Sequence, residues 1–183
     1  MSVLLKRALD AAAVWHRDQL RKYPVARVPY VSHLAGVVAI LARHGFSEEV
    51  QAAGALHDVI EDQEVSPEEL GARFGGRVRD LVVACSEQDR TLPWEERKAR
   101  YLEAFSHKSW EAQAITLADK IDNLESIVVA REQAEADAVW SQFKRGKDAQ
   151  LARFQALLER ARQLAPHPLV DEYARAVAGA SDV

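Results

Sequence analysis

The chain has 183 residues, of which 48% are hydrophobic and 28% are charged, and its net charge is −4. This length is enough for one domain with a buried core, and the composition is that of an ordinary globular protein. The balance of 24 basic and 28 acidic residues argues against a general binder of DNA, RNA or anionic membranes. A small anionic substrate is compatible with it, because a few local cations are enough to hold one.

Cys85 is the only cysteine, so we expect no intrachain disulfide and no zinc site built on several thiolates. Near the N-terminus, Lys6, Arg7 and Asp10 interrupt the apolar residues, so the uninterrupted apolar core of a signal peptide is missing. No stretch is long enough to span a bilayer. We therefore predict a cytoplasmic protein without a membrane segment.

Apolar residues recur at helical spacing along most of the chain, and no segment alternates with the period of two typical of a strand. Prolines, glycines and capping residues divide the chain into helices. The predicted helices span residues 3–20, 32–44, 47–62, 66–74, 77–85, 93–105, 110–130 and 138–164, with a last short one that ends near residue 177. With short loops and no repeat or linker, residues 1–183 are predicted to form one all-α domain, a compact helical bundle.

The strongest local signal for a helix start is Ser66-Pro67-Glu68-Glu69. Serine caps the helix, proline occupies its first turn, and Glu69 stands three residues on to complete a capping box. Ser47 begins another helix, since two glutamates follow it and favour the positive end of the helix dipole. This second helix is predicted to carry the sequence G-A-L-H-D-V-I-E-D, residues 54–62, at its far end.

Residues 54–62 place an imidazole and three carboxylates at the end of an apolar run. Charged groups are costly away from water unless they are paired or bound to a metal. Two residues elsewhere could complete a site: His33 at the head of a predicted helix, and Asp119 inside the apolar stripe of residues 115–127. Two imidazoles and two carboxylates suit Mn²⁺, Fe²⁺ or Zn²⁺, which would lower the pKa of a bound water.

The same residues also have a purely structural interpretation, without a metal. An adjacent pair such as His57-Asp58 is common by chance, and an aspartate at a helix end is usually solvated. Asp119 could be a core residue hydrogen-bonded to a neighbouring helix end. The metal site is favoured by the combination and order of the pieces, with His33 first, then His57-Asp58, then Asp119.

This ordered set resembles the HD superfamily of metal-dependent phosphohydrolases. It is most similar to the hydrolase domain of RelA/SpoT-type alarmone enzymes of the stringent response and to their stand-alone single-domain relatives. The matching stretches lie within about residues 15–125, and helices over 138–178 would complete the bundle; they are HRDQLRK, PYVSH, ALHDVIED, FGGRVRDLV, TLPWEERK and LADKIDNL. The resemblance implies an HD-type fold. It also implies that Mn²⁺, or another divalent transition metal, is bound by His33, His57, Asp58 and Asp119.

The resemblance implies further roles around the metal. Glu61 and Asp62 match an acidic pair that positions or activates the attacking water, and in a continuous helix both would face the metal cavity. Arg21 and Lys22 match a cationic pair at the mouth of the substrate site. Asn123 matches an asparagine that reaches the sugar and phosphate region. The alternatives are a solvated helix end for the acidic pair, surface cations, and an asparagine that satisfies backbone groups.

Five further residues are expected near this site with other roles. His16 is expected to support the site and not to bind the metal. For the other four, a stacking and phosphate-binding rim is one interpretation, and core packing with a solvated face is the other: Trp140, Phe143, Lys144 and Lys147.

The implied activity is Mn²⁺-dependent hydrolysis of guanosine 3′,5′-bis(diphosphate)-type alarmones with release of the 3′-pyrophosphate. Two departures from the family pattern favour an alternative, an HD phosphohydrolase of another nucleotide or phosphoester. They are Thr116, where lysine is frequent, and Glu125, where arginine is frequent. A non-catalytic nucleotide-binding module is a further alternative, against which the intact Glu61-Asp62 pair argues.

Overall fold

The computed structural model describes residues 1–87 and 91–183, and every regular element among them is a helix. The first six are α1 (Val3–Trp15), α2 (Val31–Arg43), α3 (Glu48–Ala55), α4 (Val59–Gln63), α5 (Pro67–Phe74) and α6 (Gly76–Cys85). The other five are α7 (Trp94–Phe105), α8 (Trp110–Arg131), α9 (Ala136–Trp140), α10 (Gly146–Ala161) and α11 (Pro168–Ser181). The predicted all-α fold is confirmed.

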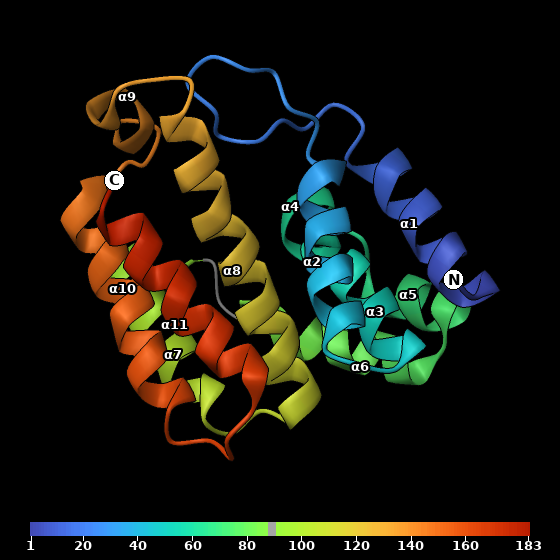
Figure 1. The fold of residues 1–183 in the computed structure, drawn as a ribbon. Coiled ribbons are helices and arrows are strands. Elements are labelled where there is room, and N and C mark those ends of the chain that lie inside the picture. The colour runs from blue at the N-terminus through green and yellow to red at the C-terminus, as the bar shows by residue number, and fades with distance from the viewer. Residues whose placement is uncertain (88–90) are drawn as a thin grey trace.

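Helix α8 runs through the middle of the molecule, with α1 to α6 on one side and α7, α9, α10 and α11 on the other (Figure 1). Helices α2 and α3 pack against it from the first group and α11 from the second. The run of residues 112–119 is buried without interruption, so this part of α8 is enclosed on every face. A polar residue there, such as Asp119, therefore faces other protein groups and not bulk solvent.

Several helix ends follow the chemistry of their sequences. The Ser66 hydroxyl accepts a hydrogen bond from the Glu69 amide at 3.1 Å, which confirms the predicted cap of α5. Gly75 has a φ of +91° between α5 and α6, a backbone conformation that a side chain would strain. Within the described residues, no helix has the length and apolar character needed to cross a membrane.

Three predicted helices differ from the structure. The first ends at Trp15, and the loop after it returns through an isolated antiparallel bridge between Leu20 and Pro29. The helix predicted over 47–62 is interrupted by a turn at residues 56–58, which separates α3 from α4. The helix predicted over 138–164 is divided into α9 and α10, and Gly146 at the start of α10 has a φ of +70°.

Candidate metal centre and the cavities beside it

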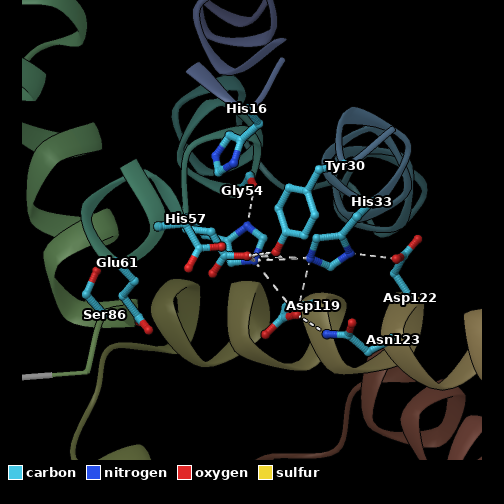
Figure 2. Close-up of polar contacts among 12 residues, drawn as sticks. His16, Tyr30, His33, Gly54, His57, Glu61, Ser86, Asp119, Asp122 and Asn123 are labelled. Carbon is cyan, nitrogen blue, oxygen red and sulfur yellow. Dashed lines mark hydrogen bonds and ion pairs between the residues drawn. The ribbon is translucent and has the colours of Figure 1, made fainter. Parts of the chain in front are cut away.

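Four side chains from three parts of the chain meet beside the middle of α8 (Figure 2). His33 comes from the first turn of α2, His57 and Asp58 from the turn between α3 and α4, and Asp119 from α8. The His57 Nε2 atom lies 3.1 Å from Asp58 Oδ2 and 3.8 Å from Asp119 Oδ1. The His33 Nε2 atom lies 3.4 Å from Asp119 Oδ1 and 3.8 Å from Asp58 Oδ2. The structure thus brings together all four residues that the sequence singled out.

Most of these distances suit the ligands of one divalent ion. Ligand atoms about 2.0–2.2 Å from a common metal lie roughly 3 to 3.6 Å from one another, depending on the coordination geometry. The two Nε2 atoms of His33 and His57 are 3.4 Å apart, and the shorter distance from each to a carboxylate is also within that range, while the two distances of 3.8 Å exceed it slightly. A mixed set of imidazole nitrogens and carboxylate oxygens suits Mn²⁺, Fe²⁺ or Zn²⁺. The arrangement is that of a His/Asp metal-binding site.

The electrostatics of the cluster also favour a cation at its centre. Burial disfavours the charged form of His57, but the carboxylates of Asp58 and Asp119 raise its pKa well above the usual range. Burial opposes ionisation of both aspartates as well, yet His57 lowers the pKa of Asp58, and Lys120 lowers that of Asp119. Both carboxylates therefore stay ionised, and a divalent ion at this place would take over the positive charge that His57 otherwise supplies to them.

Both imidazoles are held so that Nε2 points to the centre. The Nδ1 atom of His33 lies 2.6 Å from an Asp122 carboxylate oxygen, and that of His57 lies 2.8 Å from the Gly54 carbonyl oxygen. Such partners fix the ring orientation and leave Nε2 as the ligand atom. Gly36 makes room for Asp122, since a Cβ atom there would lie 1.9 Å from Asp122 Oδ1. No signal in the sequence indicated this support from α8, because Asp122 reaches His33 only through the packing of α8 against α2.

A tyrosine and a further histidine support the site from the loop before α2. The Tyr30 hydroxyl donates to Asp58 Oδ2, and burial followed by the charge of Asp58 raises the tyrosine pKa, so the hydroxyl keeps its proton. The His16 ring stacks on the Tyr30 ring, with 4.9 Å between centroids, and its Nδ1 lies 2.7 Å from the Gln19 side-chain oxygen. His16 therefore contacts the site through Tyr30.

A cavity of about 340 Å³ opens on one side of the ligands. Arg21 crosses it and donates to Asn123 Oδ1 and Asp122 Oδ2, both at 3.1 Å, and to the Ser126 hydroxyl at 2.5 Å. The residues of this large cavity that bear on function are Arg21, Lys22, Tyr23, Tyr30, Asp62, Asn123 and Phe143. The three residues predicted to contact the substrate thus share one cavity.

Trp140, Phe143, Lys144 and Lys147, for which two interpretations were open, have different surroundings in the structure. Phe143 lines the large cavity, and the Lys22 ammonium lies 5.7 Å from the centre of its ring. Trp140 is buried in the core, as the packing interpretation has it. Lys144 is exposed, and the Lys147 ammonium lies 5.9 Å from the centre of the Trp140 ring. Of the four, only Phe143 offers a stacking face to the cavity.

A smaller cavity of about 90 Å³ lies on the other side of the ligands. Its walls carry His57, Asp58, Glu61, Cys85, Glu87, Lys98, Tyr101, Ile115, Thr116, Asp119, Lys120 and Arg153. Asp119 connects the two cavities, since Oδ1 accepts from the Asn123 amide on the large side and Oδ2 lies 2.5 Å from the Lys120 ammonium on the small side. The candidate metal ligands therefore lie between a large cavity with aromatic walls and a small cavity whose walls carry both cations and carboxylates.

Glu61 and Asp62 do not face the same cavity, contrary to the prediction. Glu61 lines the small cavity and accepts a hydrogen bond from the Glu87 amide at 2.9 Å. Asp62 lines the large one and accepts from the Gln19 side-chain amide at 2.7 Å. Adjacent residues of a helix point about 100° apart, and α4 starts only after the turn that carries the metal ligands. Burial and, next, the charge of Asp58 raise the pKa of Glu61.

The two departures from the family pattern lie in different surroundings. Thr116 is buried in the wall of the small cavity, where its hydroxyl donates to the Ala112 carbonyl at 3.0 Å. Glu125 is exposed on α8 and lines neither cavity. The first departure therefore bears on the charge of the site, and the second lies outside it.

Residues 8–148 match the family model of the HD domain. The guanosine-3′,5′-bis(diphosphate) 3′-pyrophosphohydrolase MESH1 of Xenopus tropicalis is 38% identical over 128 residues, which cover 69% of this chain and 70% of that protein. The Drosophila melanogaster protein of the same name is 36% identical over 146 residues, which cover 79% of this chain and 78% of that protein.

Two solved structures share the fold. One is described as a metazoan ortholog of SpoT that hydrolyzes ppGpp and plays a role in starvation responses. It superimposes with a TM-score of 0.78 at 30% identity, and 96% of each chain is covered. The other, lmo0812 from Listeria monocytogenes EGD-e, has a TM-score of 0.73 at 44% identity, over 79% of this chain and 96% of that one.

Proposed function

The chain belongs to the HD domain family and is a metal-dependent phosphohydrolase, and from that premise we propose that it hydrolyses guanosine 3′,5′-bis(diphosphate)-type alarmones and releases the 3′-pyrophosphate. The single observation that carries the proposal is the place of the ligand cluster, between a large cavity with aromatic walls and a small one that brings three cations close to the candidate metal ligands. A nucleotide whose phosphates branch from its sugar needs both kinds of surface, one on each side of the bond that is cleaved.

The large cavity suits the nucleoside. Arg21 is held by three acceptors, so its planar guanidinium presents a fixed face to a base. Phe143 adds an aromatic face, and Lys22 lies beside it. Asn123 lies next to the metal ligand Asp119, where it can reach the sugar near the reacting phosphate.

The small cavity suits the phosphates that leave. It holds three cations beside the metal ligands: Lys98 and Lys120, which are paired with carboxylates, and Arg153. Positive charge placed before the reaction stabilises the charge that develops on phosphoryl oxygens, and it does so more strongly in a site that excludes water. The volume, about 90 Å³, leaves room for a phosphate group but not for a base.

We assign the proton transfer from the attacking water to Glu61. When bound, Mn²⁺ or another divalent ion at His33, His57, Asp58 and Asp119 would supply a water of lowered pKa and polarise the phosphoryl group. Glu61, whose pKa is raised by burial, accepts a proton from the attacking water. The water oxygen bonds to the 3′-phosphorus and the bond from that phosphorus to the 3′-oxygen breaks. The 3′-oxygen takes up a proton from solvent water, and Glu61 returns its proton to solvent.

A second candidate is an HD phosphohydrolase of another nucleotide or phosphoester. The observation that favours it is Thr116, an uncharged side chain in the wall of the small cavity. A site with fewer cations discriminates less strongly for heavily phosphorylated substrates. The two candidates differ in the substrate and agree on the metal chemistry.

The test is a screen of phosphate and pyrophosphate release over a panel of nucleotides. Metal-stripped protein is given Mn²⁺, and we expect release of pyrophosphate from the guanosine 3′,5′-bis(diphosphate) at the highest kcat/KM. Asp119→Ala should lose both the bound ion, about one per chain in the wild type, and at least ~10³-fold in turnover.

Three outcomes would contradict parts of this proposal. Faster hydrolysis of another nucleotide would favour the second candidate. Tight nucleotide binding without turnover, in protein that holds its metal, would make the chain a binding module. Equal metal content in wild type and Asp119→Ala would remove that residue from the site.

A further inference from the structure

We propose that Arg153 of α10 is a phosphate-binding residue that completes the small cavity. The proposal rests on the proposed function in one respect, namely that a phosphate group occupies this cavity. Arg153 lies outside the stretches on which the sequence analysis rested, and it comes from the group of helices that supplies none of the four ligand residues (Figure 1).

The position of Arg153 is set by α10. Its side chain lines the small cavity together with Glu61, Lys98 and Lys120. The guanidinium carbon lies 5.0 Å from the centre of the Trp94 ring, so the aromatic face of α7 holds one side of it. A half-buried side chain with this support has few alternative conformations.

Within residues 1–87 and 91–183, no carboxylate forms an ion pair with Arg153, and its side-chain partner is the Gln150 amide oxygen at 3.1 Å. The other cations of the small cavity are paired. Lys98 bonds to Glu87, and the Lys120 ammonium lies 2.5 Å from Asp119. A guanidinium has five N–H groups, so most of those on Arg153 are free to bind a ligand.

The pairing of the charges in the cavity leaves one cation to bind an anion. Of the four carboxylates in its walls, Asp58 and Asp119 belong to the metal cluster, Glu61 accepts from the Glu87 backbone amide, and Glu87 is shared between Arg97 and Lys98. This leaves Arg153 as a cation without a compensating carboxylate among the described residues. Its planar fork of N–H groups matches two oxygens of one phosphate group. The ligand class is therefore a phosphate or pyrophosphate group, delivered beside the metal ligands.

The experiment compares two matched variants of the Mn²⁺-loaded protein, Arg153→Met and Arg160→Met. Methionine keeps the apolar stem of the side chain and removes its charge. Arg160 is the control because it lies on the same helix and is exposed. Two quantities are measured for each: the affinity for inorganic pyrophosphate by calorimetry, and kcat/KM for the nucleotide.

We expect Arg153→Met to weaken pyrophosphate binding and lower kcat/KM by about 10- to 100-fold, the scale of losing hydrogen bonds to a charged group. Metal content should stay at the wild-type value, and Arg160→Met should match the wild type in both measurements. Arg153→Lys should recover part of the loss, since an ammonium keeps the charge but not the fork.

The outcomes separate this proposal from the proposed function. If pyrophosphate binding depends on Arg153 but no nucleotide of the panel is hydrolysed, Arg153 stands and the proposed function fails. If Arg153→Met hydrolyses the nucleotide and binds pyrophosphate as well as the wild type does, the Arg153 proposal is overturned and the function stands. Equal losses in Arg153→Met and Arg160→Met would also overturn it.

Discussion

The two cavities beside the metal ligands are built in different ways. The large one, about 340 Å³, combines the loop before α2 with the C-terminal half of α8 and the segment after α9. The small one, about 90 Å³, is lined by residues of α4, α6, α7, α8 and α10, by the turn at residues 56–58 and by Glu87 after α6. A loop forms much of the wall of the first cavity, and helices contribute most of the wall of the second.

Their cations differ as well. Arg21 in the large cavity donates to Asn123, Asp122 and Ser126, one of which is a carboxylate, so its charge is compensated and its side chain is held in place. In the small cavity Arg153 has no carboxylate partner among the described residues. This difference suggests a division of work, in which the large cavity recognises the nucleoside and the small one holds the group on which the chemistry takes place.

The acidic pair gives the sharpest test of this division, because Glu61 and Asp62 lie in different cavities. We expect Glu61→Gln to lower kcat by at least ~10²-fold, since it removes a positioned proton acceptor. Asp62→Asn should mainly raise KM, by about 3- to 10-fold, because it alters a wall of the nucleoside cavity and its bond to Gln19. Steady-state kinetics of the two single variants measure both parameters.

Metal content and far-ultraviolet circular dichroism are the controls for both variants, since neither residue is among the four proposed ligands. The reverse pattern, with kcat lost in Asp62→Asn and kept in Glu61→Gln, would move the chemistry to the large cavity. Equal effects of the two changes on kcat and KM would mean that the two cavities do not have separate roles in binding and chemistry.

The sequence predicted the ligand cluster because its pieces are short local motifs that occur in a recognisable order. His57-Asp58 ends an apolar run, His33 opens a helix, and Asp119 interrupts an apolar stripe; each alone has an ordinary structural explanation, and their combination indicated the metal site. The helix cap at Ser66 is local too, and the structure confirms the bond from the Glu69 backbone amide to the Ser66 hydroxyl. What is encoded within a few residues could be predicted.

Features that depend on the packing between helices could not be predicted from the sequence. The turn at residues 56–58 divides a segment whose apolar pattern looks continuous, and this turn sends Glu61 and Asp62 to different cavities. In the sequence, Asp122 looks like any other charged residue of α8. Its role beside His33 becomes visible only when α2 packs against α8 with Gly36 next to Asp122. Arg153 has no motif around it, and only the packing of α10 brings it to the site.

A change in the residues that support the metal ligands should have a smaller effect than a change in Glu61. In Gly36→Ala, a Cβ atom would lie 1.9 Å from Asp122 Oδ1, so this carboxylate must move away from His33 and Arg21. Loss of a partner behind a metal ligand typically costs 10- to 100-fold in metal affinity. We expect a loss of this size, measured by competition with a chelator.

Gly71→Ala is the matched control for that variant. It also adds a methyl group to a helical glycine, but the nearest atom, in the Arg79 side chain, would be 3.4 Å away. We expect unchanged metal affinity and a gain of about 0.5–1 kcal/mol in unfolding free energy, from the helix propensity of alanine. Wild-type metal affinity in Gly36→Ala would show that Asp122 does not orient His33.

The smallest functional effect is expected at Cys85, an uncharged residue in the wall of the small cavity. If this cavity works through its charges, Cys85→Ala should change kcat/KM by less than about twofold, while removal of the buried sulfur costs about 1 kcal/mol of stability.

The Cys85 thiol should also be unreactive, because burial raises its pKa to about 11. At pH 8 roughly one thiol in a thousand is then ionised, and the thiolate is the form that alkylating reagents attack. We expect alkylation by iodoacetamide to be slow in the folded protein, to accelerate as the pH rises toward 11, and to become fast at pH 8 once the chain is unfolded in denaturant. Rapid alkylation of folded protein at pH 8, with loss of pyrophosphate binding, would show instead that the small cavity is open to solvent and that its volume, more than its charge, selects what it holds.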